Sequence, residues 1–510
     1  MNIQQYLLES FKKYNDYNAL FINNVYYKYN QLADLSYKIA DTILSIEYSK
    51  QPVIIIGSKS FNTHAAICGT IIAGSYYTPL NEIFPLERNI NIINTSKAKI
   101  LILDYTDFSG YEEILNNING YSIICPDEHY EFLTNKFTNH TFYKAQNYNN
   151  NLLKAEKNDA VYMLFTSGST GIPKGIKISH LNLSSYIQAF KKRNNVTHKD
   201  RIMQMNDLTF DLSIHSIFLS FLFGACLYIP DNNSKINPNK FINTNEITHI
   251  LMVPSSLAIM KKLRLLKSSS FQSIKYLAFC GEALPFNNAV LMAEAAPNAK
   301  LENIYGPTEA TIACTYFEFN KNTKELPEYT GSMPIGKAYD GMEVFLIDEN
   351  KNIINNGMGQ IVLSGNQLAK GYINNEVQTK EKFIKIDNKN CYLTGDIGRW
   401  VNGELVFLGR NDAQVQIKGY RVELYEIENA LSKIDGIISC AVIPTPVNSI
   451  SYENTAAFIV AKNINTEFLK KELLEKLPPY MVPNQYVILD NMPLNSNGKI
   501  DRNQLKNMLK

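Results

Sequence analysis

Short, continuous apolar segments recur through the first 300 residues and alternate with stretches patterned like helices. Five of them are "PVIIIGS" (52–58), "KILILDY" (99–105), "AVYMLFT" (160–166), "THILMVPS" (248–255) and "IKYLAFCGE" (274–282). Strands that are apolar throughout are typical of parallel sheets with helices on both faces. The pattern therefore predicts an α/β fold for this part of the chain.

The pattern changes after about residue 330. "MEVFLID" (342–348), "GQIVLSG" (359–365) and "ELVFLGR" (404–410) follow one another closely, which predicts a small antiparallel barrel or sheet. Further on, within residues 419–434, apolar side chains recur at spacings of 3, 4 and 3, as on one face of a helix: Leu424, Ile427, Leu431 and Ile434. The last hundred residues are predicted to be a separate α+β unit with its boundary near Asp412.

Composition excludes several classes of protein. The chain is 45% hydrophobic and 19% charged, and its 50 basic and 48 acidic residues give a formal net charge of +2. This balance gives no electrostatic case for nucleic acid or an anionic membrane. Seven scattered cysteines indicate neither a zinc site nor a disulfide framework, and the first residues lack a secretion signal. We expect a cytoplasmic protein with no membrane insertion.

The segment "FTSGSTGIPKG" (165–175) has the composition of a phosphate-binding loop. Glycines and small hydroxyl residues follow a buried strand, so backbone N–H and side-chain O–H groups are free to bind phosphate oxygens. It is not a P-loop of the G-x-x-x-x-G-K-[ST] type, because Pro173 precedes Lys174 and Gly175 follows it.

Three further loops carry related chemistry. "NIYGPTEAT" (303–311) places a hydroxyl beside a carboxylate that could hold Mg²⁺, and "YLTGDIG" (392–398) offers a carboxylate for ribose hydroxyls. "NGKIDR" (497–502) offers a lysine in a turn. Taken singly, each could be an ordinary turn, a solvated acid or a surface lysine.

Taken in order, the motifs resemble the adenylate-forming superfamily of acyl-CoA synthetases, peptide-synthetase adenylation domains and luciferases. The ordered motifs are "FTSGSTGIPKG", "FDLS" (210–213), "YGPTEAT" (305–311), "GQIVLSGNQLAKGY" (359–372), "YLTGDIG", "GRNDAQVQIKGYRVELYEIE" (409–428), "LPPYMVP" (477–483) and "NGKIDR". The resemblance implies a large N-terminal domain, residues 1–411, of two helix-covered, mainly parallel sheets plus a small β-barrel. A small mobile α+β domain, residues 412–510, would follow, with a hinge at Asp412.

The resemblance also implies a reaction with Mg·ATP. A carboxylate would attack the α-phosphorus, pyrophosphate would leave, and a thiol would then accept the acyl group. The implied nucleotide-binding residues are Thr166, Ser167, Thr170, Asn303, Ile304, Tyr305, Gly306, Pro307, Thr308, Asp396, Arg410 and Lys499. Among them, Tyr305 would stack on adenine, Asp396 and Arg410 would hold the ribose, and Lys174 would support the loop.

Three residues are implied to act on the reacting groups. Lys499 would bridge the carboxylate and the phosphate, and such an electrostatic contact typically contributes roughly 10²–10³ in rate. Thr308 and Glu309 would meet the α-phosphate and Mg²⁺, with Thr166 as a second metal-binding residue. Turning of the small domain about Asp412 would withdraw Lys499 and bring the "QIKGYR" loop to the thiol tunnel.

Asp211 in "FDLS" stands where amino-acid-activating members hold the substrate's ammonium group. On sequence alone it could instead cap a helix. The implied substrate pocket is Asp211, Leu212, His215, Met252, Ala278, Cys280, Ile304, Ile312, Ala313 and Lys499. Its bulky residues favour a small substrate. Cys280 could also be an ordinary core cysteine, and His215 could be structural or could contact a polar substrate.

Within the superfamily, "FCGEALP" (279–285) and the motifs above most resemble the D-alanine–carrier-protein ligases. Stand-alone adenylation enzymes for another amino acid remain a rival hypothesis. A coenzyme A ligase for a small carboxylic acid is less favoured because of Asp211, and a silent scaffold because Glu309, Asp396 and Lys499 are present. The chain stops soon after Lys499, so we expect the acceptor to be a separate phosphopantetheinyl carrier protein, or coenzyme A. We also expect a monomeric enzyme.

Overall fold

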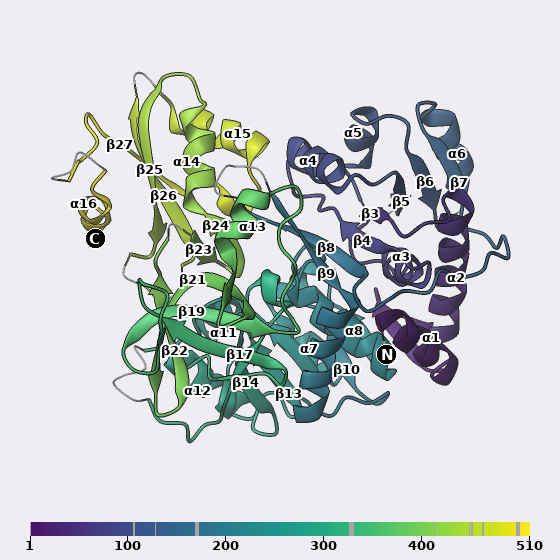
Figure 1. The fold of residues 1–510 in the computed structure, drawn as a ribbon, viewed down its shortest axis with the longest axis horizontal. Helices are drawn as coiled ribbons and strands as arrows, with labels where there is room; N and C mark the ends of the chain where they lie inside the picture. The colour runs from purple at the N-terminus through teal and green to yellow at the C-terminus, as the bar shows by residue number, and fades with distance from the viewer. Residues whose placement is uncertain are drawn as a thin grey trace.

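The computed structural model describes residues 2–105, 108–127, 129–168, 173–325, 331–412, 414–447, 449, 452–461, 464–495 and 500–509. Two large sheets, a smaller antiparallel sheet and a C-terminal domain make up the fold (Figure 1). In the part of the chain so described, none of the helices has the length and apolar content needed to cross a bilayer. The expected α/β fold class is confirmed.

The first sheet has seven strands in the order β7-β6-β5-β3-β4-β8-β9, parallel except where β9 pairs with β8. Its strands are β3 (Pro52–Ile56), β4 (Tyr76–Pro79), β5 (Ile100–Leu103), β6 (Ser122–Cys125), β7 (Thr141–Lys144), β8 (Ala160–Thr166) and β9 (Lys174–Ser179). The predicted apolar segments at 52–58, 99–105 and 160–166 all form strands of this sheet. They are buried because helices cover both faces.

The second sheet has nine strands in the order β16-β15-β14-β13-β12-β10-β11-β1-β2. Its strands are β1 (Asn18–Ile22), β2 (Val25–Lys28), β10 (Arg201–Met203), β11 (Cys226–Ile229), β12 (His249–Met252), β13 (Tyr276–Phe279), β14 (Lys300–Tyr305), β15 (Thr315–Phe319) and β16 (Lys337–Ala338). The central strands are parallel, and β2, β15 and β16 pair antiparallel at the edges. Predicted strands at 248–255 and 274–282 are β12 and β13.

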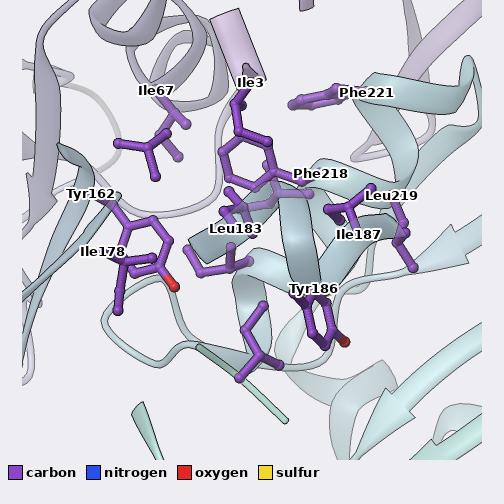
Figure 2. Close-up of a cluster of buried hydrophobic side chains, with 14 of the residues drawn as sticks. Ile3, Ile67, Tyr162, Ile178, Leu183, Tyr186, Ile187, Phe218, Leu219 and Phe221 are labelled. Carbon is purple, nitrogen blue, oxygen red and sulfur yellow. The ribbon is translucent and has the colours of Figure 1, made fainter. Parts of the chain in front are cut away.

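Alternate side chains of β3 point into two different layers of the core. Val53 and Ile55 join the large cluster between the two sheets, whereas Ile54 and Ile56 join the cluster on the outer face. Figure 2 shows part of the central cluster, where side chains of α7 and α8 lie among those of α1, α3 and β8. The fold is therefore a stack in which helices lie outside and between two sheets.

The helices of this stack follow the strands in sequence. They are α1 (Ile3–Lys13), α2 (Tyr29–Ile46), α3 (Phe61–Ile72), α4 (Leu86–Ser96), α5 (Tyr111–Asn116), α6 (Tyr130–Lys136), α7 (His180–Arg193), α8 (Leu212–Phe223), α9 (Asn232–Ile236), α10 (Pro238–Thr244), α11 (Pro254–Lys262), α12 (Phe286–Ala295) and the 3₁₀ turn η2 (Thr308–Ala310). Helix α8 ends at Gly224, whose φ of 78° suits a left-handed C-cap.

A six-stranded antiparallel sheet follows, as the close-set strands predicted. It contains β17 (Met342–Ile347), β18 (Ile353–Ile354), β19 (Met358–Gly365), β20 (Phe383–Ile386), β21 (Lys389–Val401) and β22 (Glu404–Arg410), with α13 (Glu376–Lys382) between β19 and β20. The long strand β21 pairs with β19, β20 and β22. This sheet joins the second sheet where Gly336, next to β16, bridges Leu405 of β22.

The C-terminal domain begins with the hairpin of β23 (Gln414–Ile417) and β24 (Tyr420–Glu423). A three-stranded sheet follows, of β25 (Ile437–Thr445), β26 (Asn454–Ala461) and β27 (Gln485–Ile488), with α14 (Leu424–Ser432), α15 (Thr466–Lys476), η4 (Pro479–Met481) and α16 (Arg502–Asn507). The helix predicted within 419–434 is α14, which begins only at Leu424, because residues 420–423 form strand β24. In Figure 1 this domain lies over one side of the core, with α16 farthest out.

Candidate active site at the carboxyl ends of the sheets

Parallel strands of both sheets end at the same region, and the residues that follow them carry polar side chains. Strands β8, β13 and β14 are followed by Ser167, Cys280 and Gly306 respectively. Carboxyl ends of parallel strands meet at one edge, where ligands of α/β proteins bind. Most of the predicted site residues are brought together here. Thr170 and Lys499 lie outside the described residues.

A cavity of about 430 Å³ opens between the core and the C-terminal domain. Its lining residues come from the end of β14, from β21 and β22, and from the C-terminal domain: Asn303, Ile304, Tyr305, Gly306, Pro307, Asp396, Arg410, Arg421, Arg502 and Lys506 among them. Its volume is within the range of small-molecule sites. Gly306 passes close to Ala313, since a Cβ on Gly306 would lie 2.6 Å from the Ala313 Cα.

Asp396 lies at the wall of this cavity between Tyr305 and Arg410. The Tyr305 hydroxyl donates to Asp396 Oδ2 at 2.5 Å, and Arg410 Nη1 forms an ion pair with Oδ1. Arg410 also binds Asp412 with two nitrogens, at 2.7 and 2.8 Å. Burial raises the pKa of Asp396, and Arg410 opposes this shift. The predicted ribose pair is thus a formed ion pair, and it also holds Asp412.

Asn303 lines the cavity, but its amide nitrogen is already engaged. It donates to the carbonyl oxygens of Met333 at 3.2 Å and Pro334 at 2.8 Å. These bonds fasten the strand end to the segment after residue 330 and leave the amide oxygen to face a ligand. Met333 and Ile335 line the same cavity, and sequence patterns had not marked them.

Glu309 is almost completely buried, with 1% of its surface exposed. Its Oε1 accepts a hydrogen bond from the Tyr372 hydroxyl and its Oε2 contacts Arg421 Nη1, both at 2.7 Å. Burial opposes ionisation, yet Arg421 and Tyr372 hold the pKa of Glu309 at about 2. The group is therefore a carboxylate at every pH of interest. Tyr372 is in the quoted "LAKGY" motif, but its contact with Glu309 had no sequence signal.

The donor set around Glu309 suits Mg²⁺ only in part. Carboxylate and hydroxyl oxygens are appropriate ligands, and Mg²⁺ usually takes one or two carboxylates together with substrate phosphates and water. Within the described residues, no group of three or more His, Cys, Asp or Glu side chains is arranged to hold a metal ion. Thr308 and Glu309 fit the ion if phosphate oxygens complete the site and Arg421 withdraws.

The C-terminal domain contacts the start of the phosphate loop. Ser167 Oγ donates to the Arg421 carbonyl at 2.8 Å, and the Gly168 amide donates to Glu426 Oε2 at 3.2 Å. Glu426 also pairs with the core residue Arg88 at 2.7 Å, with both side chains buried. Lys174 Nζ lies 3.9 Å from Glu423 Oε1, consistent with a supporting role for this lysine. Thr166 is the last residue of β8.

Asp211 is the first residue of the candidate substrate pocket. It occupies the N-cap position of α8 but its side chain makes no capping hydrogen bond, so the capping alternative is not supported. Burial raises its pKa to about 6, while a hydrogen bond with Thr308 acts in the opposite direction. Burial, and then the nearby Asp211 carboxylate, raises the pKa of the Cys280 thiol. Asp211, Thr308 and Cys280 therefore share one small region.

The other predicted pocket residues are buried but do not all face the same way. Leu212, Ala278, Cys280, Ile304, Ile312 and Ala313 belong to the central cluster between the sheets. Met252 belongs to the cluster on the opposite face of the second sheet, with Ile250 and Phe279. The preceding residue Leu251 faces the central cluster, as the alternation of a strand requires.

The His215 side chain is held by contacts with neighbouring core residues. Its Nδ1 lies 2.6 Å from the Tyr186 hydroxyl, and its ring packs against Phe190 and Tyr276. Burial lowers the pKa of His215 to about 3, so the ring is neutral. Behind it, the Tyr276 hydroxyl donates to Glu302, which pairs with Arg193 at 2.7 Å. These contacts fix the position and orientation of the imidazole ring.

The tip of the β23–β24 hairpin is fastened to the core. Glu282 Oε1 accepts from the Gly419 amide at 2.5 Å, and Oε2 accepts from the Ser255 amide at 2.7 Å. Beside it, the Tyr420 ring contacts the core residue Phe210 at 4.6 Å and stacks on Tyr480 at 3.9 Å. The hairpin thus packs on Phe210, the residue that precedes Asp211. Glu282 was within a quoted motif, without an assigned role.

Comparisons with known proteins agree with this geometry. The family model described as AMP-binding enzyme matches residues 7–373, and the model for the AMP-binding enzyme C-terminal domain matches residues 426–499. A D-alanine–D-alanyl carrier protein ligase of Bacillus velezensis is 31% identical over 490 residues, 94% of this chain and 93% of that protein. Gramicidin S synthase 1 of Brevibacillus brevis is 31% identical over 99% of this chain and 44% of its own length.

A solved structure is also similar over nearly the whole chain. It is the Vibrio cholerae adenylation domain AlmE in complex with glycyl-adenosine-5′-phosphate, with a TM-score of 0.91 and 29% identity. The match covers 99% of this chain and 97% of that one.

Proposed function

Because the chain belongs to the AMP-binding family of adenylate-forming enzymes, we propose that it activates a small amino acid, D-alanine in the first instance, as an aminoacyl-adenylate. It then transfers the aminoacyl group to the thiol of a phosphopantetheine arm on a separate carrier protein. The single observation that carries this proposal is the buried Asp211 carboxylate at the N-cap of α8, which makes no capping hydrogen bond and lies near Thr308 and Cys280.

In the first step, an oxygen of the amino acid's carboxylate attacks the α-phosphorus of ATP. A new P–O bond forms, the bond to the bridging oxygen breaks, and pyrophosphate leaves with that electron pair. Tyr305 and the Asp396–Arg410 pair hold the adenosine, and Thr308 positions the α-phosphate. Mg²⁺, held through Glu309 with Thr308 and Thr166 as hydroxyl ligands, would neutralise charge on the phosphates. Lys499, outside the described residues, bridges the two anionic reactants.

In the second step, the thiol sulfur attacks the acyl carbonyl. A C–S bond forms, the C–O bond to AMP breaks, AMP leaves with the electron pair, and the thiol proton passes to solvent. The domain arrangement described above suits this step. The hairpin tip at Gly419 lies against the core, and Arg421 forms an ion pair with Glu309. Return of Lys499 for the next adenylation requires the C-terminal domain to turn about Asp412.

The ammonium group of the substrate distinguishes amino acids from plain carboxylic acids. An ionised Asp211 in a largely desolvated pocket forms a strong, directional contact with an ammonium group. A simple carboxylic acid would leave that carboxylate buried without a partner, which is costly. This argues against a coenzyme A ligase for a small carboxylic acid.

The pocket walls favour a very small side chain. Cys280, Ile304 and Ile312 are buried in the central cluster, and His215 is fixed in place by Tyr186. D-alanine is supported by the Bacillus velezensis relative and by a sulfur atom near the expected α-carbon. Glycine is the second candidate, because the similar AlmE structure contains glycyl-adenosine-5′-phosphate.

Amino-acid-dependent exchange of pyrophosphate into ATP tests the proposal. The panel is D-alanine, L-alanine, glycine, serine and larger amino acids, with acetate and propionate as acids that lack an ammonium group. Highest kcat/KM for D-alanine is the expected result. Highest kcat/KM for glycine would establish the second candidate. Exchange only with the plain acids would overturn the role of Asp211, and exchange with none would overturn the proposed activity.

A further inference from the structure

The C-terminal domain places a carboxylate against the phosphate loop. Glu426 of α14 is 2% exposed, and its Oε2 accepts a hydrogen bond from the Gly168 amide at 3.2 Å. The Ser167 hydroxyl donates to the Arg421 carbonyl oxygen at 2.8 Å. Backbone amides and small hydroxyl groups of such a loop are the donors that phosphate oxygens need. Both of these donors are therefore bound to oxygens of the C-terminal domain, in the places where phosphate oxygens would bind.

Arg88 of the core binds the other oxygen of the same carboxylate. Its Nη1 lies 2.7 Å from Glu426 Oε1, and the arginine side chain is 6% exposed. Arg88 belongs to α4, and its guanidinium lies 5.2 Å from the centre of the Phe84 ring. Burial raises the pKa of Glu426, and Arg88 is the first group that opposes this shift. The core thus supplies the cation that this buried carboxylate requires.

Arg88 and the Gly168 amide together form a site for one anionic group. A guanidinium and a backbone N–H are donors with which proteins bind phosphate oxygens. The oxygens of a carboxylate are arranged similarly, so Glu426 fills the site much as a phosphate group would. Among the described residues, the buried Nε of Arg88 has no hydrogen-bond partner. The guanidinium therefore has a further donor for an anion with more oxygens than a carboxylate.

The C-terminal domain covers this anion site. Tyr480 of that domain packs against the core cluster that contains Phe84, and α15 lies against α4. When the domain turns about Asp412, as the proposed function requires, Glu426 leaves with it. Arg88 and the Gly168 amide then lose the anion that both of them bind, at the place where the phosphate loop begins.

We propose that Arg88 binds the departing phosphates of ATP, and that Glu426 takes their place when the C-terminal domain docks for thiol transfer. This inference rests on the proposed function. Pyrophosphate and Glu426 use one anion site in turn, made of Arg88 and the Gly168 amide. They exclude each other because both are anions that bind to the same donors.

The test measures the Kd of pyrophosphate by isothermal titration calorimetry with Mg²⁺ present. The enzyme is first saturated with an aminoacyl-sulfamoyl adenosine that carries the amino acid preferred in pyrophosphate exchange. This analogue fills the amino acid and AMP positions and does not react with pyrophosphate, so binding alone is measured. Arg88→Met should weaken pyrophosphate binding about 10- to 100-fold, because charge-assisted hydrogen bonds are lost. Arg88→Lys keeps the charge and should recover part of the affinity.

Glu426→Gln should have the opposite effect. The amide binds Arg88 less strongly than the carboxylate does, so pyrophosphate should bind about fivefold more tightly. Glu428→Gln is the matched control, because Glu428 lies on the same helix and pairs with Arg502 of its own domain at 2.6 Å. This control should keep the wild-type Kd. A merely structural ion pair between Arg88 and Glu426 would not give opposite changes in its two variants. Thermal unfolding of each variant shows whether it is folded.

Two results would overturn the inference. One is an unchanged Kd of pyrophosphate in Arg88→Met, and the other is weaker pyrophosphate binding in Glu426→Gln. Failure of the proposed function is a separate result. If none of the aminoacyl analogues binds to the wild-type enzyme, the proposed substrate class is wrong. The same titration of the free enzyme and its variants then decides whether Arg88 binds pyrophosphate.

Discussion

Arg421 Nη1 of the C-terminal hairpin lies 2.7 Å from Glu309 Oε2 of the core. The two side chains are 19% and 1% exposed, so this ion pair is shielded from solvent. It joins the residue proposed to hold Mg²⁺ to the element proposed to serve thiol transfer. The same carboxylate oxygen is therefore used either by the arginine or by the metal, depending on where the C-terminal domain lies.

Arg421→Met should slow thiol transfer much more than pyrophosphate exchange. The ion pair exists with the hairpin docked, and removing one partner of a buried pair costs up to about 3–5 kcal/mol. We expect transfer to fall at least roughly tenfold, measured by quenched single turnover from preformed adenylate. Lys418→Met, on the same hairpin, removes only a 3.3 Å contact to Asn454 and is the control. Equal losses in both half-reactions would contradict this assignment.

Gly419→Ala should also impair transfer selectively. Gly419 has φ of +83°, and an added Cβ would lie 2.4 Å from Val253 Cγ1 of the core, so the hairpin tip cannot dock unchanged. Gly403→Ala is the matched control. Gly403 has φ of +79° in the β21–β22 turn but nothing lies within 4 Å of its added Cβ. Similar transfer rates in the two variants would show that backbone strain, not the contact with Val253, decides the effect.

The pH dependence of amino acid use should reflect Asp211. Burial raises its pKa to about 6, so the carboxylate that binds an ammonium group predominates above that pH and is lost below it. In pyrophosphate exchange, kcat/KM for the amino acid should fall about tenfold per pH unit below about pH 6. Asp211→Asn should give a low, flat profile in the same range. His215, with a pKa of about 3, does not titrate there, so His215→Gln should keep the wild-type inflection.

Tyr186→Phe should destabilise the core and loosen the pocket wall. The variant leaves the buried His215 Nδ1 without its partner at 2.6 Å, which typically costs about 1–3 kcal/mol. The free energy of unfolding, from urea titration, measures this loss. Tyr48→Phe, at a residue 56% exposed, should leave stability unchanged. An intact stability in Tyr186→Phe would mean that water or another group satisfies the imidazole.

The strands could be predicted from the sequence, but the face of the sheet to which each side chain points could not. The apolar segments at 160–166 and 248–255 became β8 and β12 because continuous burial leaves few alternatives. For the same reason the segment around Met252 gives no alternation, and its packing on the opposite face of the sheet could not be read from the pattern. His215 likewise lies on a helix that is buried on all sides.

The contacts between the domains were beyond sequence reasoning. Glu282 with Gly419, and Arg421 with Glu309, join residues more than a hundred positions apart. Their partners depend on where the C-terminal domain rests, which local propensity does not determine. The nucleotide-site residues Tyr305, Asp396 and Arg410, by contrast, were predicted from short motifs and do lie together, because each follows or belongs to a strand whose position the core fixes.

The cavity of about 430 Å³ has walls from both domains, with Tyr305 and Asp396 on one side and Arg502 and Lys506 on the other. Any nucleotide that fills it is in effect a non-covalent cross-link between two bodies that must separate for the next cycle. AMP left behind after transfer would hold the enzyme in its finished state. The rate of repeated turnover would then be limited by the release of AMP rather than by the chemical steps.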